Sequence, residues 1–117
     1  MSEDTADLQA LSRSINTILI LGVLRDDEKH GYQIALDISE VSSGLFELQH
    51  GTLYPVLHKM EKQGWISGRW RKQEGRRRKV YRITGEGRRY LHGETDRFEV
   101  LARSVLALVR GPGHATT

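Results

Sequence analysis

The segment GTLYPVLHKMEKQGWISGRWRKQEGRRRKVYRIT (Gly51–Thr84) decides the fold, because its periodicity changes part-way along. Its first half carries apolar residues at three- and four-residue steps: Leu53, Val56, Leu57 and Met60. This stripe predicts an amphipathic helix over about 49–63. Gly64 is well suited to end that helix, because glycine adopts the left-handed conformation at little cost.

The second half of the segment predicts a β-hairpin. Residues 65–71 and 80–84 are short runs with aromatic and β-branched side chains, which favour strands. The stretch between them, KQEGRRRK (72–79), is expected to be a charged loop around one glycine. Eight cations fall within the 14 residues from Arg69 to Arg82, and Glu74 is the one acidic residue in that window.

Helices are expected on both sides of this segment. On the N-terminal side, apolar stripes predict a helix over about 8–25 and a second over about 30–41, the latter stopped by Ser-Ser-Gly at 42–44. On the C-terminal side, Thr84 is a good N-cap for a long helix over 85–110.

The expected fold class is mainly α with a small β-hairpin. Three helices followed by a two-stranded hairpin give a winged helix-turn-helix, in which the second and third helices form the helix-turn-helix. The apolar stripe of the last helix is longer than a monomer of this size needs, which indicates a dimerisation helix. The expected division is a DNA-binding domain at 8–84, a dimerisation helix at 85–110, and flexible tails at 1–7 and 111–117.

The charge of the chain is strongly polarised. Residues 51–89 hold twelve basic and three acidic side chains, a net +9, whereas residues 1–50 hold three and nine, a net −6. This distribution indicates a polyanionic partner. The longest apolar run is too short to span a membrane, the first residues are acidic rather than signal-like, and there is no cysteine. A soluble cytoplasmic protein is the simplest expectation.

The outward face of the third helix is the first candidate DNA-binding surface. It presents Thr52, Tyr54, Pro55, His58, Lys59 and Lys62. Small and ring-shaped groups near the N-terminal end can approach base edges, and the basic groups further along can meet phosphates. An ordinary amphipathic helix with a solvated lysine face fits these residues equally well.

The hairpin is the second candidate surface. Its cations are expected to contact phosphates or the minor groove, and they comprise Arg69, Arg71, Arg76, Arg77, Arg78 and Lys79. The alternative is a flexible, solubilising loop.

Three motifs resemble the PadR family of transcriptional regulators, in its short form with one C-terminal helix. They are HGYQI (30–34), GTLYPVLHKMEKQGWI (51–66) and RRRKVYRITGEGRRYL (76–91). The resemblance implies a winged helix, homodimers built through the first and last helices, and binding to double-stranded operator DNA that usually represses transcription. It also implies that Tyr32 contacts phosphate, that Thr52, Tyr54 and Pro55 lie in the major groove, and that Tyr81 anchors the wing.

A small aromatic or hydrophobic effector is expected at the dimer interface. The candidate lining residues are Leu11, Ile15, Phe98, Leu101, Ala102 and Val105. A dry dimer interface explains the same residues equally well. Of the two tryptophans, Trp65 is expected in the core, whereas Trp70 is expected either half-exposed on the wing or packed on the first helix.

No catalytic, metal or cofactor site is expected. The five histidines are scattered, with no pair at an i, i+4 spacing, and the chain has neither a nucleophile elbow nor a phosphate-binding glycine loop. The rival to a DNA-binding regulator is an adaptor that keeps the winged-helix shape and binds an acidic protein.

Overall fold

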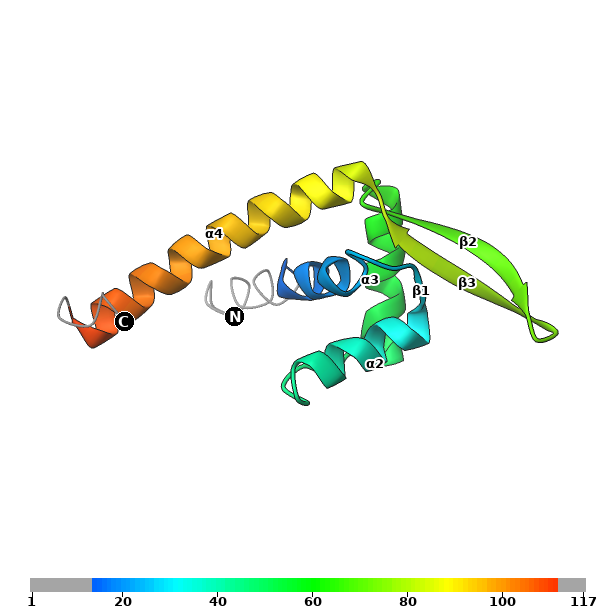
Figure 1. Ribbon diagram of the computed structural model, residues 1–117, viewed down its shortest axis with the longest axis horizontal. Helices are drawn as coiled ribbons and strands as arrows, with labels where there is room; N and C mark the ends of the chain where they lie inside the picture. The colour runs from blue at the N-terminus through cyan, green and yellow to red at the C-terminus, as the bar shows by residue number, and fades with distance from the viewer. Residues whose placement is uncertain (1–13, 112–117) are drawn as a thin grey trace, which may run out of the picture.

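The computed structural model describes residues 14–111 and confirms the expected winged-helix order (Figure 1). A helix over 14–23 comes first. The elements that follow are β1 (Lys29–His30), α2 (Gly31–Val41), α3 (His50–Lys62), β2 (Ile66–Gln73), β3 (Arg76–Ile83) and α4 (Gly85–Arg110). The expected tails, apart from Gly111, and the first residues of the expected N-terminal helix lie outside the described part.

The wing belongs to a three-stranded antiparallel sheet, of which the sequence predicted two strands. The order is β1-β3-β2, with Lys29 opposite Tyr81 and His30 opposite Val80. The added strand, β1, ties the chain that enters α2 to the central strand of the wing. An ion pair of 2.8 Å between Lys29 Nζ and Asp37 Oδ2 then fixes β1 to α2 and lowers the pKa of the Asp37 carboxyl.

The prediction of a charged loop over 72–79 is wrong. Both strands continue through this stretch, and the turn is only Glu74-Gly75. Glu74 and Gly75 have φ of 51° and 77°, the positive values that a two-residue type I′ hairpin turn requires. A ribbon exposed on both faces accepts charged side chains, so its composition resembled that of a loop.

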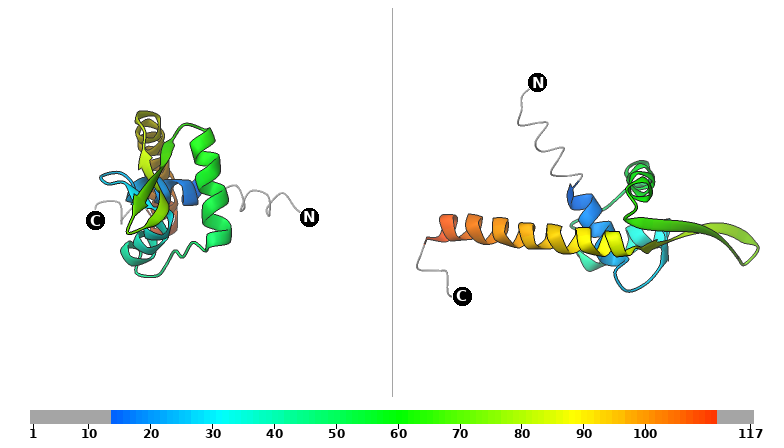
Figure 2. Two further views of the ribbon diagram at one scale, coloured as in Figure 1. Left: turned by 90° about the vertical axis from the view of Figure 1, so that its right-hand side faces the viewer. Right: turned by 90° about the horizontal axis from the view of Figure 1, so that it is seen from above.

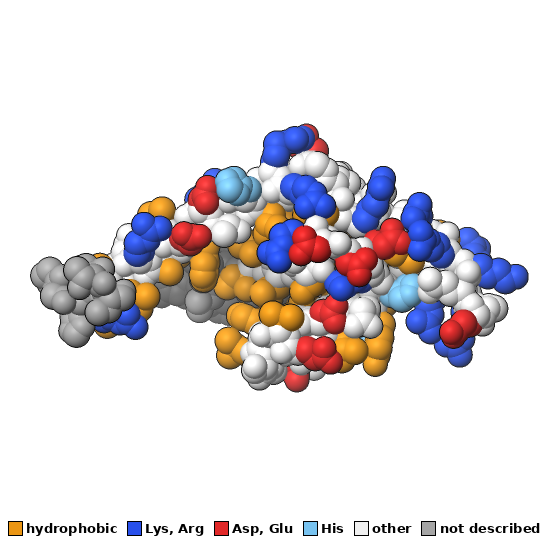
Figure 3. Space-filling view, viewed as in Figure 1, with side chains coloured by type: hydrophobic (Ala, Val, Ile, Leu, Met, Phe, Trp, Pro, Cys, Tyr) orange, Lys and Arg blue, Asp and Glu red, His pale blue; other side chains and the backbone are white. Residues whose placement is uncertain are grey.

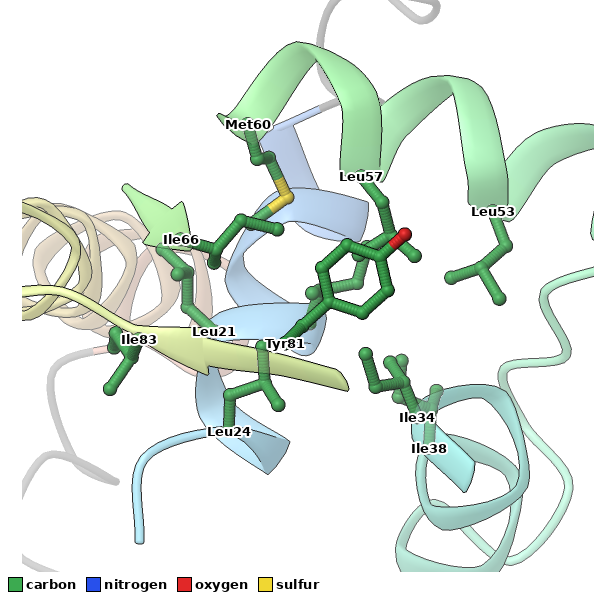
Figure 4. Close-up of a cluster of buried hydrophobic side chains, with 11 residues drawn as sticks. Leu21, Leu24, Ile34, Ile38, Leu53, Leu57, Met60, Ile66, Tyr81 and Ile83 are labelled. Carbon is green, nitrogen blue, oxygen red and sulfur yellow. The ribbon is translucent and has the colours of Figure 1, made fainter. Parts of the chain in front are cut away.

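The core lies where the first three helices meet the base of the sheet (Figure 4). The N-terminal helix contributes Leu21 and α2 contributes Ile34 and Ile38, all at 2% exposure or less. Side chains from α3 and the sheet complete the cluster, namely Leu53, Leu57, Met60, Ile66, Tyr81 and Ile83. The apolar stripe predicted for α3 is therefore confirmed, and its burial leaves the opposite face of that helix in solvent.

The start of α4 is fixed to the end of α3. Thr84 Oγ1 accepts a hydrogen bond of 3.0 Å from Gly87 N, as the predicted N-cap requires, and donates one of 2.6 Å to Gly64 O. Trp65 stacks on Tyr90 with ring centroids 3.8 Å apart, which confirms that Trp65 packs against the core. A Cβ built on Gly87 would overlap the Trp65 carbonyl oxygen, so α4 begins in direct backbone contact with the core.

Beyond this attachment, α4 projects from the body as a long helix (Figures 1 and 2). The wing projects in the opposite direction, and the molecule is correspondingly elongated, at 59 × 38 × 28 Å. The DNA-binding candidates and the dimerisation candidates thus lie toward opposite ends.

Replacing Gly87 with alanine is expected to destabilise the chain by about 1–3 kcal/mol, because the new methyl group must displace the Trp65 backbone. Denaturant unfolding would measure the loss. Gly93→Ala in the same helix is the matched control, since its Cβ would meet nothing closer than the Arg97 guanidinium at 3.5 Å, and it should stabilise by about 0.5–1 kcal/mol. Equal effects of the two substitutions would contradict the close contact at Gly87.

Candidate nucleic-acid interface

All six residues predicted on the outward face of α3 are exposed. They are Thr52, Tyr54, Pro55, His58, Lys59 and Lys62, and they lie opposite the buried stripe of the helix. The structure therefore presents them together on one surface.

Tyr54 is held in place by the start of α2. A Cβ built on Gly31 would lie 2.9 Å from both Cε1 and Oη of Tyr54, so the tyrosine ring packs directly on the backbone of Gly31. The ring of His50 approaches Tyr54 edge-on, with centroids 5.6 Å apart. Tyr54 keeps 43% of its surface in solvent, and the adjacent Tyr32 keeps 60%. The HGYQI motif thus contributes a glycine that positions a candidate DNA-binding residue, a role that the sequence alone did not reveal.

A groove of about 820 Å³ separates the outward face of α3 from the wing. Tyr32, Tyr54 and His58 line one side, and Trp70 and the cations of β3 line the other. Figure 3 shows Lys and Arg side chains gathered over the wing. The groove therefore brings part of each candidate surface together. Six of the candidates lie outside its lining: Thr52, Pro55, Lys59, Lys62, Arg69 and Arg71.

The hairpin register sorts the wing cations onto two faces. Trp70 stands opposite Lys79, and Lys72 stands opposite Arg77. Because opposed and alternate residues in an antiparallel ribbon share a face, these four lie on the side of Tyr81, which faces the core and α3. The other face carries five arginines: Arg69, Arg71, Arg76, Arg78 and Arg82.

Carboxylates from outside the wing already neutralise part of its charge. Glu28, before β1, pairs with Arg71 at 2.7 Å and with Arg69 at 3.3 Å. Glu61, on α3, pairs with Lys79 at 2.8 Å. In the described part of the chain, no ion pair involves the arginines nearest the turn, which are Arg76, Arg77 and Arg78. Among the predicted wing cations, these three are the ones whose charge no carboxylate of the described residues neutralises.

Aromatic rings lie beneath the cations that face α3. Arg77 lies 5.2 Å from the ring centroid of Trp70, and Lys79 Nζ lies 5.5 Å from that of Tyr81. Burial, reinforced by the nearby Glu61 carboxylate, raises the pKa of Tyr81 to about 12. The Tyr81 phenol is therefore neutral at ordinary pH and adds no negative charge to the groove.

The candidate dimer and effector residues lie at the other end of the molecule. Phe98, Leu101 and Val105 on α4 are 49–52% exposed, and Ile15 and Ala102 are partly buried. Leu11, the sixth candidate, lies outside the described residues. An exposed apolar stripe of this kind is typical of a surface that binds a partner.

Residues 14–111 hold no group of three or more His, Cys, Asp or Glu side chains placed to bind a metal ion. The same residues include no helix with the length and hydropathy needed to cross a membrane.

Comparison with protein families identifies the chain. Residues 20–93 match the transcriptional regulator PadR-like family. The chain belongs to this family. Its membership confirms the resemblance seen in the sequence and places the chain among transcriptional regulators rather than enzymes.

Individual relatives agree with the family assignment. The chain is 34% identical to the transcriptional regulator Rv3488 of Mycobacterium tuberculosis, over 85% of this chain and 90% of that protein. It is 31% identical to the negative transcriptional regulator PadR of Bacillus subtilis, over 74% of this chain and 48% of that protein.

Solved structures share the fold. A transcriptional regulator from Clostridium thermocellum matches with a TM-score of 0.75 and 28% identity, over 82% of this chain and 94% of that one. Bacillus subtilis PadR in complex with operator DNA matches with a TM-score of 0.63 and 31% identity, over 68% of this chain and 45% of that one.

Proposed function

We propose that this PadR-like regulator is a sequence-specific DNA-binding repressor that acts as a homodimer on an inverted-repeat operator. The observation that carries the proposal is the groove lined by Tyr54 and His58 of α3 and by the wing arginines Arg76, Arg77 and Arg78, which have no ion-pair partner among the described residues. The structural similarity to Bacillus subtilis PadR, which was solved with operator DNA, supports the same assignment. Action on DNA inside the cell would make the protein cytoplasmic.

In this proposal α3 enters the major groove. Thr52, Tyr54 and Pro55, in the first half of the helix, contact base edges and thymine methyl groups. Phosphates are contacted by Tyr32 of α2 and by three residues in the second half of α3, namely His58, Lys59 and Lys62.

The wing supplies most of the affinity, through phosphates or the minor groove. Arg76, Arg77 and Arg78 contribute most directly, because they have no carboxylate partner among the described residues. Arg69, Arg71 and Lys79 can join only by sharing or leaving Glu28 and Glu61.

Binding to duplex DNA is expected to fall about 10³-fold or more between roughly 50 and 200 mM salt, for about six to eight phosphate contacts per dimer. A gel-shift titration measures this loss, with polyglutamate in place of DNA as the probe for the rival adaptor function. A flat salt response, or equal binding to polyglutamate, would contradict the proposal.

Two substitutions divide the roles within the same assay. Tyr54→Ala should lose discrimination between operator and random DNA, whereas Arg77→Ala should weaken binding to both alike. Arg110→Ala, which removes a cation from the far end of α4, is the matched control and should leave binding unchanged.

The homodimer is proposed from the exposed apolar stripe of α4. Phe98, Leu101 and Val105 recur at the three- and four-residue spacing that pairs helices along one face. To read an inverted repeat, the two copies of α3 in the dimer would have to lie about 34 Å apart, one duplex turn.

Val105→Glu is expected to convert the dimer to a monomer, because it places a charge within the apolar stripe. Light scattering measures the mass of each species. Val100→Glu is the control, since Val100 is 61% exposed and lies on the opposite side of α4 from Phe98. A monomeric parent protein, or a Val105→Glu variant that stays dimeric, would refute the assignment.

Regulation by a small aromatic or hydrophobic effector is proposed at this same interface. A ligand between Phe98, Leu101, Ala102 and Val105 of the two copies, with Ile15 beside them, would change the angle between the winged halves. Operator affinity should therefore change when a suitable aromatic compound is added. Unchanged affinity across a broad panel of such compounds would favour a dry dimer interface.

A further inference from the structure

Trp70 occupies an unusual place for a tryptophan. It lies in β2, on the face of the wing that looks toward α3, and lines the groove with 59% of its surface exposed. The other tryptophan, Trp65, stacks on Tyr90 and packs against the core. Trp70 is not part of the buried core cluster or of the partly buried apolar residues around it, so the described fold does not depend on its large apolar ring.

Two cations of β3 orient the ring of Trp70. Its cross-strand partner Lys79 lies 6.0 Å from the ring centroid, and Arg77, one diagonal step toward the turn, lies 5.2 Å away. Lys79 is itself fixed by Glu61. The indole is therefore oriented by cations on the strand that faces it, with one side still open to the groove.

The charge of the groove indicates which partner fits it. Of the β3 cations in its lining, Arg77 and Lys79 lie on the face that looks toward α3, and the single acidic lining residue, Glu61, already pairs with Lys79. A DNA strand offers phosphates that alternate with apolar sugar faces. Arg77 beside Trp70 presents a complementary pair, a cation next to a flat apolar ring.

We propose that Trp70 is a DNA-contacting residue, whose indole packs on a deoxyribose of the strand that occupies the groove while Arg77 binds the adjacent phosphate. This assignment rests on the proposed function and adds to it an uncharged packing contact with the DNA. Aromatic and apolar side chains make comparable uncharged contacts to bases in other nucleic-acid complexes.

A fluorescence titration tests the contact directly. Trp65→Phe leaves Trp70 as the sole tryptophan and keeps an aromatic ring against Tyr90. Adding a duplex of random sequence at low salt should change the intensity and wavelength of Trp70 emission. An identical change on adding polyglutamate would overturn DNA as the occupant of the groove.

Affinity measurements on variants separate packing from charge. Trp70→Ala should weaken duplex binding by about 5- to 30-fold, with Trp70→Phe in between. The slope of affinity against salt should stay that of the parent, because no charge is lost, whereas Arg77→Ala should lower the slope by about one per protomer. Val100→Ala, a similarly exposed apolar position on α4, is the control, and circular dichroism checks that each variant is folded.

The outcomes distinguish this inference from the function on which it rests. A parent protein that binds duplex DNA, together with a Trp70→Ala variant of equal affinity and an unchanged Trp70 emission, would refute the contact and leave the proposed function standing. A parent protein that binds no duplex at low salt would overturn both.

Discussion

The close approach of the wing to α3 is the constraint on which the rest of the molecule depends. It is possible because β2 carries no side chain at Gly68. A Cβ there would lie 2.6 Å from Lys79 Cε and 2.9 Å from Glu61 Oε2, so it would collide with the ion pair that joins β3 to α3. With that space free, Tyr81 packs into the core and the ribbon leaves the body at a fixed angle to α3. The groove between them is thus built by packing.

The same arrangement explains how a chain with a net charge of only +3 concentrates its positive charge. Glu28 binds Arg69 and Arg71, and Glu61 binds Lys79, whereas Arg76, Arg77 and Arg78 keep their charge for a partner. Surface ion pairs of this kind contribute little stability, so their main effect is on where the side chains point. Acidic residues from outside the wing therefore leave its positive charge concentrated on Arg76, Arg77 and Arg78.

Much of this could be predicted from the sequence, because helical stripes and turn residues are local signals. The α3 stripe, the Thr84 cap and the outward face that carries the DNA-binding candidates follow from local patterns alone. The predicted length of the wing strands was wrong, because charged residues on a ribbon exposed on both faces resemble the composition of a loop. The pairings of Glu28 with Arg69 and of Glu61 with Lys79 span 41 and 18 positions, and β1 is two residues long. No local pattern reports such contacts, and the inward orientation of Trp70 emerged only once the hairpin register was known.

The rigid junction at Gly87 gives α4 a fixed helical phase relative to the wing. Each residue of an α-helix turns the chain by about 100°, so inserting one residue between Tyr90 and Phe98 would rotate the whole apolar stripe by that angle without disturbing either end. The direction in which a second copy could attach would swing round with it, and so would the placement of its α3. The number of residues in this stretch of α4 would therefore set the geometry of the proposed dimer, independently of which side chains the stretch contains.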